Sequence, residues 1–149
     1  MKDKKLMFME WKECEKEFIR HIEVDKEKIK SILKLVNARI NFIKSITPNK
    51  DNVSFIVENY YESIKELLVA LLLKNGLRSN NHQCLITYFY KNYPNYEYEA
   101  NVILQMSYAR NRLEYYGEPI DFEFYNKHKE DFIIIINILE NLAQNETSK

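Results

Sequence analysis

Apolar residues recur at intervals of three and four along most of this chain, which is the period of a helix with one buried face. The pattern predicts a first helix with an apolar stripe at Met7, Trp11, Cys14, Phe18 and Ile22. Asp25 is the expected N-cap of a second helix that ends near Thr47-Pro48, with a stripe at Ile29, Ile32, Leu33, Val36, Ile40 and Ile43. The chain therefore begins with two amphipathic helices.

The third apolar segment, Val53 to Asn75, is the most apolar of the chain. Its run Leu67–Leu73 covers more than one face of a helix, so we expect this helix to be central or to lie at an interface. Asp51 or Asn52 is the expected N-cap, and Gly76 is the expected C-terminal stop.

Three more helices are predicted in the second half of the chain. A short one runs from His82 to Tyr90, after a polar connection at residues 78–81. A long one runs from about Glu97 to Tyr116 and is ended by Gly117. The last helix starts near Asp121 and continues to about Gln144.

The remaining signals also favour an all-α fold. The run Phe132–Ile136 is rich in β-branched residues, but the apolar spacing on both sides of it is helical, so we predict a helix there. The chain has only 2 Gly and 3 Pro, too few for the turns of a many-stranded fold. We expect one domain, residues 1–149, folded as an antiparallel up-and-down bundle of four long helices and one or two short ones, with a frayed tail at 145–149.

Charge and hydropathy limit the possible partners. Lys plus Arg is 22 and Asp plus Glu is 22, so any binding of nucleic acid must come from a local patch rather than from the overall field. The longest apolar runs are far shorter than the roughly 20 residues that span a bilayer. The apolar run Leu6–Met9 is too short for a signal peptide. We therefore expect a soluble, cytoplasmic protein that does not bind membranes.

The two cysteines, Cys14 and Cys84, lie far apart in the sequence and form no CxxC pair. They could form one disulfide, but the interpretation we prefer is two reduced, partly buried thiols, as is usual in the cytosol. Both lie in apolar surroundings, where a lowered thiol pKa is not expected, so neither is predicted to be a nucleophile.

Residues suited to metal or acid–base chemistry are sparse. His21, His82 and His128 are scattered, and no Asp, Glu and His residues have the spacing of metal ligands. We expect no metal and no cofactor. His82, at the start of a predicted helix, is expected to cap or pack that helix rather than to act as a general base.

One segment is unusually aromatic: six rings fall within eleven residues, namely Tyr88, Phe89, Tyr90, Tyr93, Tyr96 and Tyr98. Exposed tyrosines of this kind can stack on nucleic-acid bases. The interpretation we prefer is that alternate rings fill the end of the bundle while their hydroxyl groups reach water, because only Lys91 adds positive charge among them.

The end of the fifth predicted helix contains the strongest candidates for chemistry. The simplest interpretation of Arg110 and Glu114 is an i,i+4 surface ion pair. Arg110 also follows Met106 by four and precedes Leu113 by three, so it lies near the apolar stripe and needs a partner for its charge. Residues five apart on a regular helix point about 140° apart, so Arg110 and Tyr115 meet only if the helix unwinds or two chains combine.

Several segments of the chain together resemble a known protein family. The helix with Tyr60-Tyr61 and the segment Leu71–Gly76, the loop with His82, and Arg110-Asn111 before a C-terminal helix resemble the HEPN domain family. The family's motif is Arg, a polar residue, three variable residues and His. The resemblance implies a helical bundle, commonly dimeric.

The resemblance covers about residues 53–142 and leaves residues 1–47 as an N-terminal helical extension. In active members of the family, the paired motifs of two subunits form a metal-independent ribonuclease site. Other members are partners of minimal nucleotidyltransferases in toxin–antitoxin pairs. The expected function is therefore a homodimeric RNA- or nucleotide-binding protein, a ribonuclease or toxin component, and the alternative is a non-catalytic module that binds a nucleotidyltransferase.

Arg110 and Asn111 match the first two positions of the motif, and Tyr115 stands at the histidine position. A tyrosine has an unperturbed pKa near 10, which makes it a poor proton shuttle at neutral pH, although it can donate a hydrogen bond to a phosphate. The resemblance thus implies a catalytic set of Arg110, Asn111 and Tyr115, and contacts with RNA or nucleotide from Arg110, Arg112, Tyr116 and His82.

Overall fold

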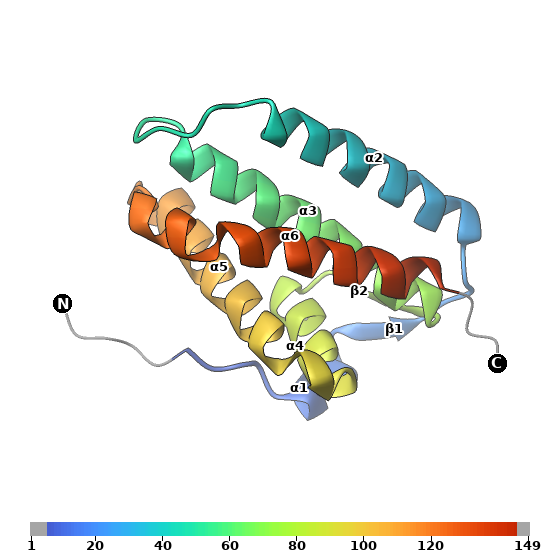
Figure 1. The fold of residues 1–149 in the computed structure, drawn as a ribbon. Coiled ribbons are helices and arrows are strands. Elements are labelled where there is room, and N and C mark those ends of the chain that lie inside the picture. Colours follow the sequence, from blue (N-terminus) through green and yellow to red (C-terminus); the bar gives the residue numbers. More distant parts are fainter. Residues whose placement is uncertain (1–5, 146–149) are drawn as a thin grey trace.

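The computed structural model describes residues 6–145. Within this range the chain forms six α-helices, one short 3₁₀ helix and two short strands (Figure 1). In chain order they are α1 (Trp11–Glu17), β1 (Ile19–His21), α2 (Lys26–Lys44), α3 (Val53–Lys74), β2 (Leu77–Ser79), α4 (His82–Asn92), η1 (Pro94–Tyr96), α5 (Glu97–Tyr116) and α6 (Phe122–Gln144). The all-α class expected from the sequence is confirmed, with four long helices.

Helix α3 lies at the centre of the bundle, and α2, α4, α5 and α6 all pack against it (Figure 1). Its buried residues include Leu67, Leu68 and Leu73, which lie on different faces of the helix. A helix that is apolar on several faces is stable in water only when neighbours cover those faces. The central position predicted for this helix is confirmed, and its apolar faces are covered by the chain's own helices.

Local signals set most helix ends correctly. The side chains of Asp25 and Asp121 cap α2 and α6 by accepting hydrogen bonds from the backbone N–H groups of Lys28 and Glu123. Gly117 ends α5 at φ 63°, a left-handed conformation in which glycine has no Cβ to clash. The β-branched run in α6 is helical, as predicted. Asn52 occupies the N-cap position of α3, but its side chain makes no capping bond.

The first predicted helix is partly wrong. Helix α1 ends at Glu17, and the chain continues into β1, which pairs antiparallel with β2 so that Arg20 faces Arg78. Met7 and Phe18, which the predicted stripe placed in the core, are exposed. The predicted polar connection at 78–81 likewise contains part of β2. A pair of three-residue strands depends on two segments that are distant in sequence, so neither segment alone signals it.

The prediction of two reduced thiols is also wrong, because Cys14 and Cys84 form a disulfide that joins α1 to α4. Both residues are fully buried. Their Cα atoms are 5.5 Å apart, a usual separation for a disulfide. The sequence showed that both cysteines lie in apolar segments, but only the packing of α1 on α4 brings them together.

Most rings of the aromatic segment pack against the protein itself, as the preferred interpretation held, but the two buried rings, Tyr88 and Phe89, are adjacent rather than alternate. Phe89 is fully buried and packs against Tyr93 and Tyr96 at ring-centroid distances of 5.8 and 6.0 Å. Tyr88 is buried against Trp11. Tyr98 is exposed, and its hydroxyl group donates to the Asp131 carboxylate over 2.7 Å. These rings are therefore mostly unable to stack on nucleic-acid bases. No helix among residues 6–145 is long and apolar enough to cross a membrane.

Candidate functional site

Arg110 lies on α5 with its side chain only 13% exposed. Its guanidinium carbon is 5.2 Å from the centre of the Tyr61 ring on α3, which is a cation–π distance. One guanidinium nitrogen, Nη1, donates to the Glu114 carboxylate over 3.3 Å and to the Asn111 side-chain oxygen over 3.4 Å. The predicted Arg110–Glu114 pair is confirmed, and the charge of Arg110 finds its partner within the same chain.

A second carboxyl group, that of Glu58 on α3, lies beside this pair. Burial raises the pKa of Glu58, and the nearby Glu114 raises it further by charge repulsion and by a hydrogen bond between the two carboxyl groups. Arg110 opposes the rise in the pKa of Glu58, but its effect is smaller. Glu58 therefore gives up its proton less readily than an isolated carboxyl group does.

His82 is the first residue of α4, and it faces the same group of side chains. Burial lowers the pKa of His82 from its ordinary value of 6.5, and the positive charges of Lys65 and Arg110 lower it further. The predicted capping role belongs to its neighbour instead, because the Asn81 side chain accepts a hydrogen bond from the Cys84 N–H over 3.1 Å. His82 therefore lies in the first turn of α4 without capping the helix.

The residues around Arg110 form what we call the Arg110 cluster: Glu58, Tyr61, Glu62 and Lys65 from α3, His82 from α4, and Arg110 with Glu114 from α5. Lys65 and Glu62 form an ion pair at 2.5 Å. None of the four residues from α3 was predicted as a site residue. Their signal was a set of polar side chains with helical spacing (58, 62 and 65) on the most apolar helix of the chain.

A cavity of about 290 Å³ adjoins the cluster and shares Lys65 and His82 with it. Lys28 and Arg78 also line this cavity, together with Ser79, Asn80 and an apolar floor, and no acidic side chain of residues 6–145 is among its lining. Helix α4 begins at its edge, so the positive end of the α4 dipole lies next to these cations. The cavity is therefore electrostatically suited to an anion.

Tyr115 does not reach Arg110. Helix α5 continues without a break to Tyr116, so the helix does not unwind before Gly117. Tyr115 is 71% exposed, whereas the side chain of Arg110 is largely buried. Only Arg110 and Asn111 of the predicted catalytic set are therefore together within one chain.

Arg112 and Tyr116 form a separate cluster at the end of α5. The Arg112 guanidinium makes a two-pronged contact with the Glu118 carboxylate and lies over the rings of Tyr108 and Tyr116, 5.6 and 5.2 Å from their centres. Arg112 lowers the pKa of Glu118 by this hydrogen bonding. Arg112 holds Glu118 with two nitrogens, whereas Arg110 reaches Glu114 with one, so Arg112 is less suited to a phosphate contact than Arg110.

The fold and the site define a mostly α-helical protein with a charged cluster beside a cationic cavity. Comparison with protein-family models, with curated proteins and with solved structures returned no match. Among the described residues, no group of three or more His, Cys, Asp and Glu side chains is arranged to hold a metal ion.

The position of His82 leads to a first prediction. We expect its titration midpoint, followed by NMR of the imidazole, to lie below 6.5, and we expect Lys65→Gln to raise it by removing a positive neighbour. The lowered pKa of His82 also makes the stability of the fold depend on pH. The unfolded chain takes up a proton at His82 near pH 6.5 and the folded chain only at lower pH, so stability from His82 is present above 6.5 and falls below it.

The control for this experiment is Lys50→Gln, in the turn before α3, because Lys50 is not among the charges that shift His82. An imidazole that titrates above 6.5, or one that responds equally to both substitutions, would place His82 outside the Arg110 cluster.

Proposed function

We propose that this chain is a HEPN-type helical protein that binds the phosphates of RNA or of a nucleotide at the Arg110 cluster and the adjoining cavity. One observation carries the proposal: Arg110, His82 and Lys65 converge from three helices beside a cavity that Lys28 and Arg78 also line. Lys65 and Arg110 already pair with Glu62 and Glu114, but no ion pair of Lys28 or Arg78 is formed among residues 6–145. The cavity therefore keeps positive charge that a bound anion would balance.

The chemistry of the cluster suits a phosphate. The Tyr61 ring holds the Arg110 guanidinium in place, and a fixed guanidinium offers paired donors that match the oxygens of a phosphate. Glu114 is 47% exposed, so it can swing away when a phosphate takes its place. A bound phosphate also favours the protonated form of His82, which adds a second charged donor.

A dimer and a ribonuclease activity are further parts of the proposal. Tyr115 is exposed near the end of α5, so a two-fold contact through this end would bring the Tyr115 of a second copy toward Arg110 and Asn111. Sedimentation equilibrium tests the dimer. Incubation with mixed RNA and a metal chelator tests cleavage, and cleavage that persists in Arg110→Gln would remove this site from the proposal.

The binding prediction concerns Arg110→Gln. We expect this substitution to weaken the binding of a single-stranded RNA, followed by fluorescence anisotropy, by about tenfold or more, since a charged hydrogen bond contributes about 1.5–3 kcal/mol. Arg39→Gln is the matched control, because Arg39 is a partly buried arginine that also pairs with a glutamate, Glu66, but between α2 and α3. Equal losses in both variants, or no binding by the unchanged protein, would refute the proposal.

The exposed end of α5 favours a second candidate function, a non-catalytic module that binds another protein such as a minimal nucleotidyltransferase. Tyr115 and Tyr116 are both 71% exposed, and adjacent exposed tyrosines are typical of protein interfaces. We expect Tyr115→Ala/Tyr116→Ala to keep the stability of the fold to within about 1 kcal/mol and to abolish co-purification with the product of a neighbouring gene. Unchanged co-purification would exclude this end of α5 as the interface.

A cytoplasmic location is also part of the proposal, and the Cys14–Cys84 disulfide stands against it. Disulfides persist in oxidising compartments and are rare in the cytosol, where thiols are kept reduced. Acid quenching of cells, alkylation in denaturant and mass measurement of the chain distinguish the two possibilities: alkylation of both cysteines supports the cytoplasm, and alkylation of neither contradicts it.

A further inference from the structure

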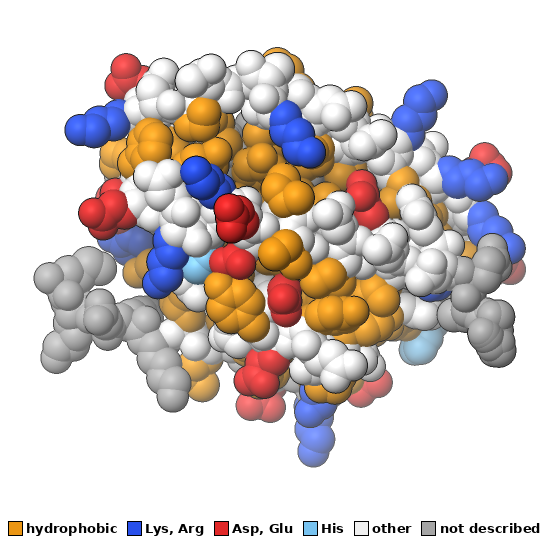
Figure 2. Space-filling model, viewed as in Figure 1, with side chains coloured by type: hydrophobic (Ala, Val, Ile, Leu, Met, Phe, Trp, Pro, Cys, Tyr) orange, Lys and Arg blue, Asp and Glu red, His pale blue; other side chains and the backbone are white. Residues whose placement is uncertain are grey.

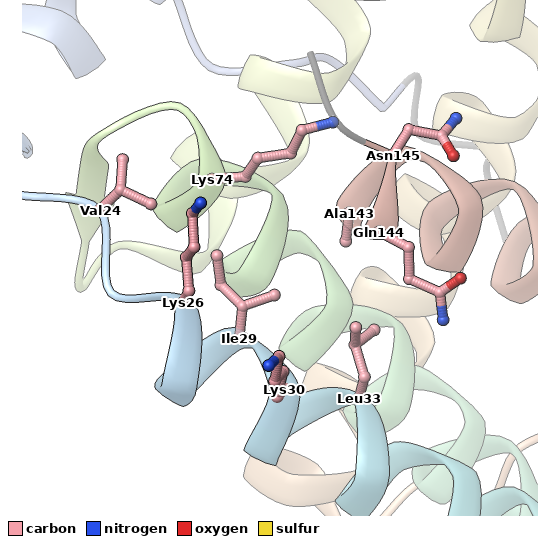
Figure 3. A pocket seen from close by; sticks show the side chains of 9 residues that line it. All are labelled: Val24, Lys26, Ile29, Lys30, Leu33, Lys74, Ala143, Gln144 and Asn145. Atoms are coloured by element: carbon pink, nitrogen blue, oxygen red, sulfur yellow. The ribbon is translucent and has the colours of Figure 1, made fainter. Parts of the chain in front are cut away.

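A second cavity, of about 410 Å³, opens where the start of α2 meets the ends of α3 and α6 (Figure 3). It is lined by Val24, Lys26, Ile29, Lys30, Leu33, Lys74, Ala143, Gln144 and Asn145. None of these residues belongs to the Arg110 cluster or to the cavity beside it. The two sites are therefore separate.

Part of the wall of this cavity is apolar, formed by Val24, Ile29, Leu33 and Ala143. Ile29 and Leu33 extend from α2 toward α6, and Ala143 extends from α6 toward α2 (Figure 3). Ile29 and Ala143 are buried and belong to a small apolar cluster with Ala70 of α3. Apolar side chains also gather on the surface between α2 and α6 (Figure 2). A hydrocarbon chain bound here would be shielded from water on several sides.

The rim of the cavity is positively charged. Its charged lining residues are Lys26, Lys30 and Lys74, and no acidic side chain of the described residues lines it. The Lys74 ammonium is anchored, since it donates to the Leu142 carbonyl of α6 over 2.6 Å. Lys26 and Lys30 are exposed, and the contact of Lys30 with Glu27 is long, at 3.8 Å. These two ammonium groups are thus able to turn toward an anion.

We propose that this cavity binds a free amphiphilic carboxylate, a monomeric saturated fatty acid of medium length. The apolar walls take the hydrocarbon chain, which contributes about 0.8 kcal/mol for each methylene removed from water, or about fourfold in affinity. Lys26 and Lys30 take the carboxylate at the rim. Pockets for small ligands measure about 300–1,000 Å³, so 410 Å³ lies at the small end and favours a medium chain over a long one.

The test is calorimetric titration of the full chain with hexanoate, octanoate and decanoate, each kept monomeric, and with octanamide as the neutral comparison. We expect saturable binding with one site, an affinity that rises about fourfold for each added methylene until the cavity is filled, and weaker binding of the amide. NMR should show contacts between the ligand chain and the methyl groups of Ile29, Leu33 and Ala143. Absence of saturable binding by decanoate, or contacts elsewhere on the protein, overturns the proposal.

Charge is tested with Lys26→Gln/Lys30→Gln, which changes two exposed residues and should leave the fold intact. We expect about fivefold weaker octanoate binding, in line with the modest strength of solvated ion pairs. Lys34→Gln/Lys50→Gln is the control, because it removes the same charge outside the cavity. Equal weakening in both variants overturns the assignment of the carboxylate to this rim. So does binding of anionic phospholipid vesicles without binding of monomeric decanoate.

Discussion

Replacing Phe132 with alanine is expected to lower the free energy of unfolding by about 3–5 kcal/mol. Phe132 is fully buried on α6, where its ring packs against Tyr60 of α3 at a centroid distance of 5.3 Å and against Phe124 at 6.3 Å. The substitution removes the buried ring and leaves a cavity between α3 and α6, which cannot collapse without moving a helix. Such a loss is a large part of the roughly 5–15 kcal/mol that stabilises a typical domain.

Urea denaturation followed by circular dichroism measures this loss, and Ile134→Ala is the matched control. Ile134 lies in the same apolar run of α6 but is exposed, so its truncation removes little buried surface. We expect it to change stability by less than about 1 kcal/mol. Similar losses in the two variants would mean that the rotation of α6 about its axis differs from the one described.

Loss of the Cys14–Cys84 disulfide is expected to lower the free energy of unfolding by about 4 kcal/mol. The two cysteines are 70 residues apart in the sequence, so their bond excludes many extended states of the unfolded chain. Both are fully buried, and the bond holds α1 and the chain before it against α4. Cys14→Ala/Cys84→Ala compared with the unchanged protein in urea measures the effect.

Dithiothreitol provides the control for this prediction, because it should destabilise the unchanged protein and have no effect on the double variant. The prediction is contradicted if alkylation in denaturant without reductant, followed by mass spectrometry, finds two free thiols and the two proteins are equally stable.

Helix limits were predictable because the signals that set them are local. Asp25 and Asp121 cap helices through bonds to residues two or three positions away, and Gly117 ends α5 through its own backbone freedom. The apolar period of α3 likewise showed that this helix needs neighbours on several sides. None of these inferences requires knowledge of a distant residue.

The first helix failed for the opposite reason. Residues 19–21 lie between Phe18 and Ile22 of the predicted apolar stripe, but they pair with Leu77–Ser79 to form a two-stranded sheet. Backbone hydrogen bonds to a distant segment outweigh a local preference that amounts to a few tenths of a kcal/mol per residue. The disulfide also depends on a contact between distant segments, because it forms only when α1 packs against α4.

Part of the candidate site was likewise predictable from local spacing, and part depends on tertiary packing. Arg110 and its pairing with Glu114 were readable from spacing on one helix, and so was the divergence of Arg110 from Tyr115. The sequence could not show that His82 joins Arg110, or that Tyr61 and Glu58 complete the surroundings of its guanidinium.

The sequence by itself determined the all-α class, the limits of the later helices and the presence of an arginine beside an apolar stripe. These follow from the periods and caps of single helices, which act over a few residues. Only the tertiary structure decided which side chains surround Arg110, whether the two cysteines meet, and where cavities with positive rims open. Those outcomes depend on how separate helices pack on α3, and packing joins residues that no local pattern connects.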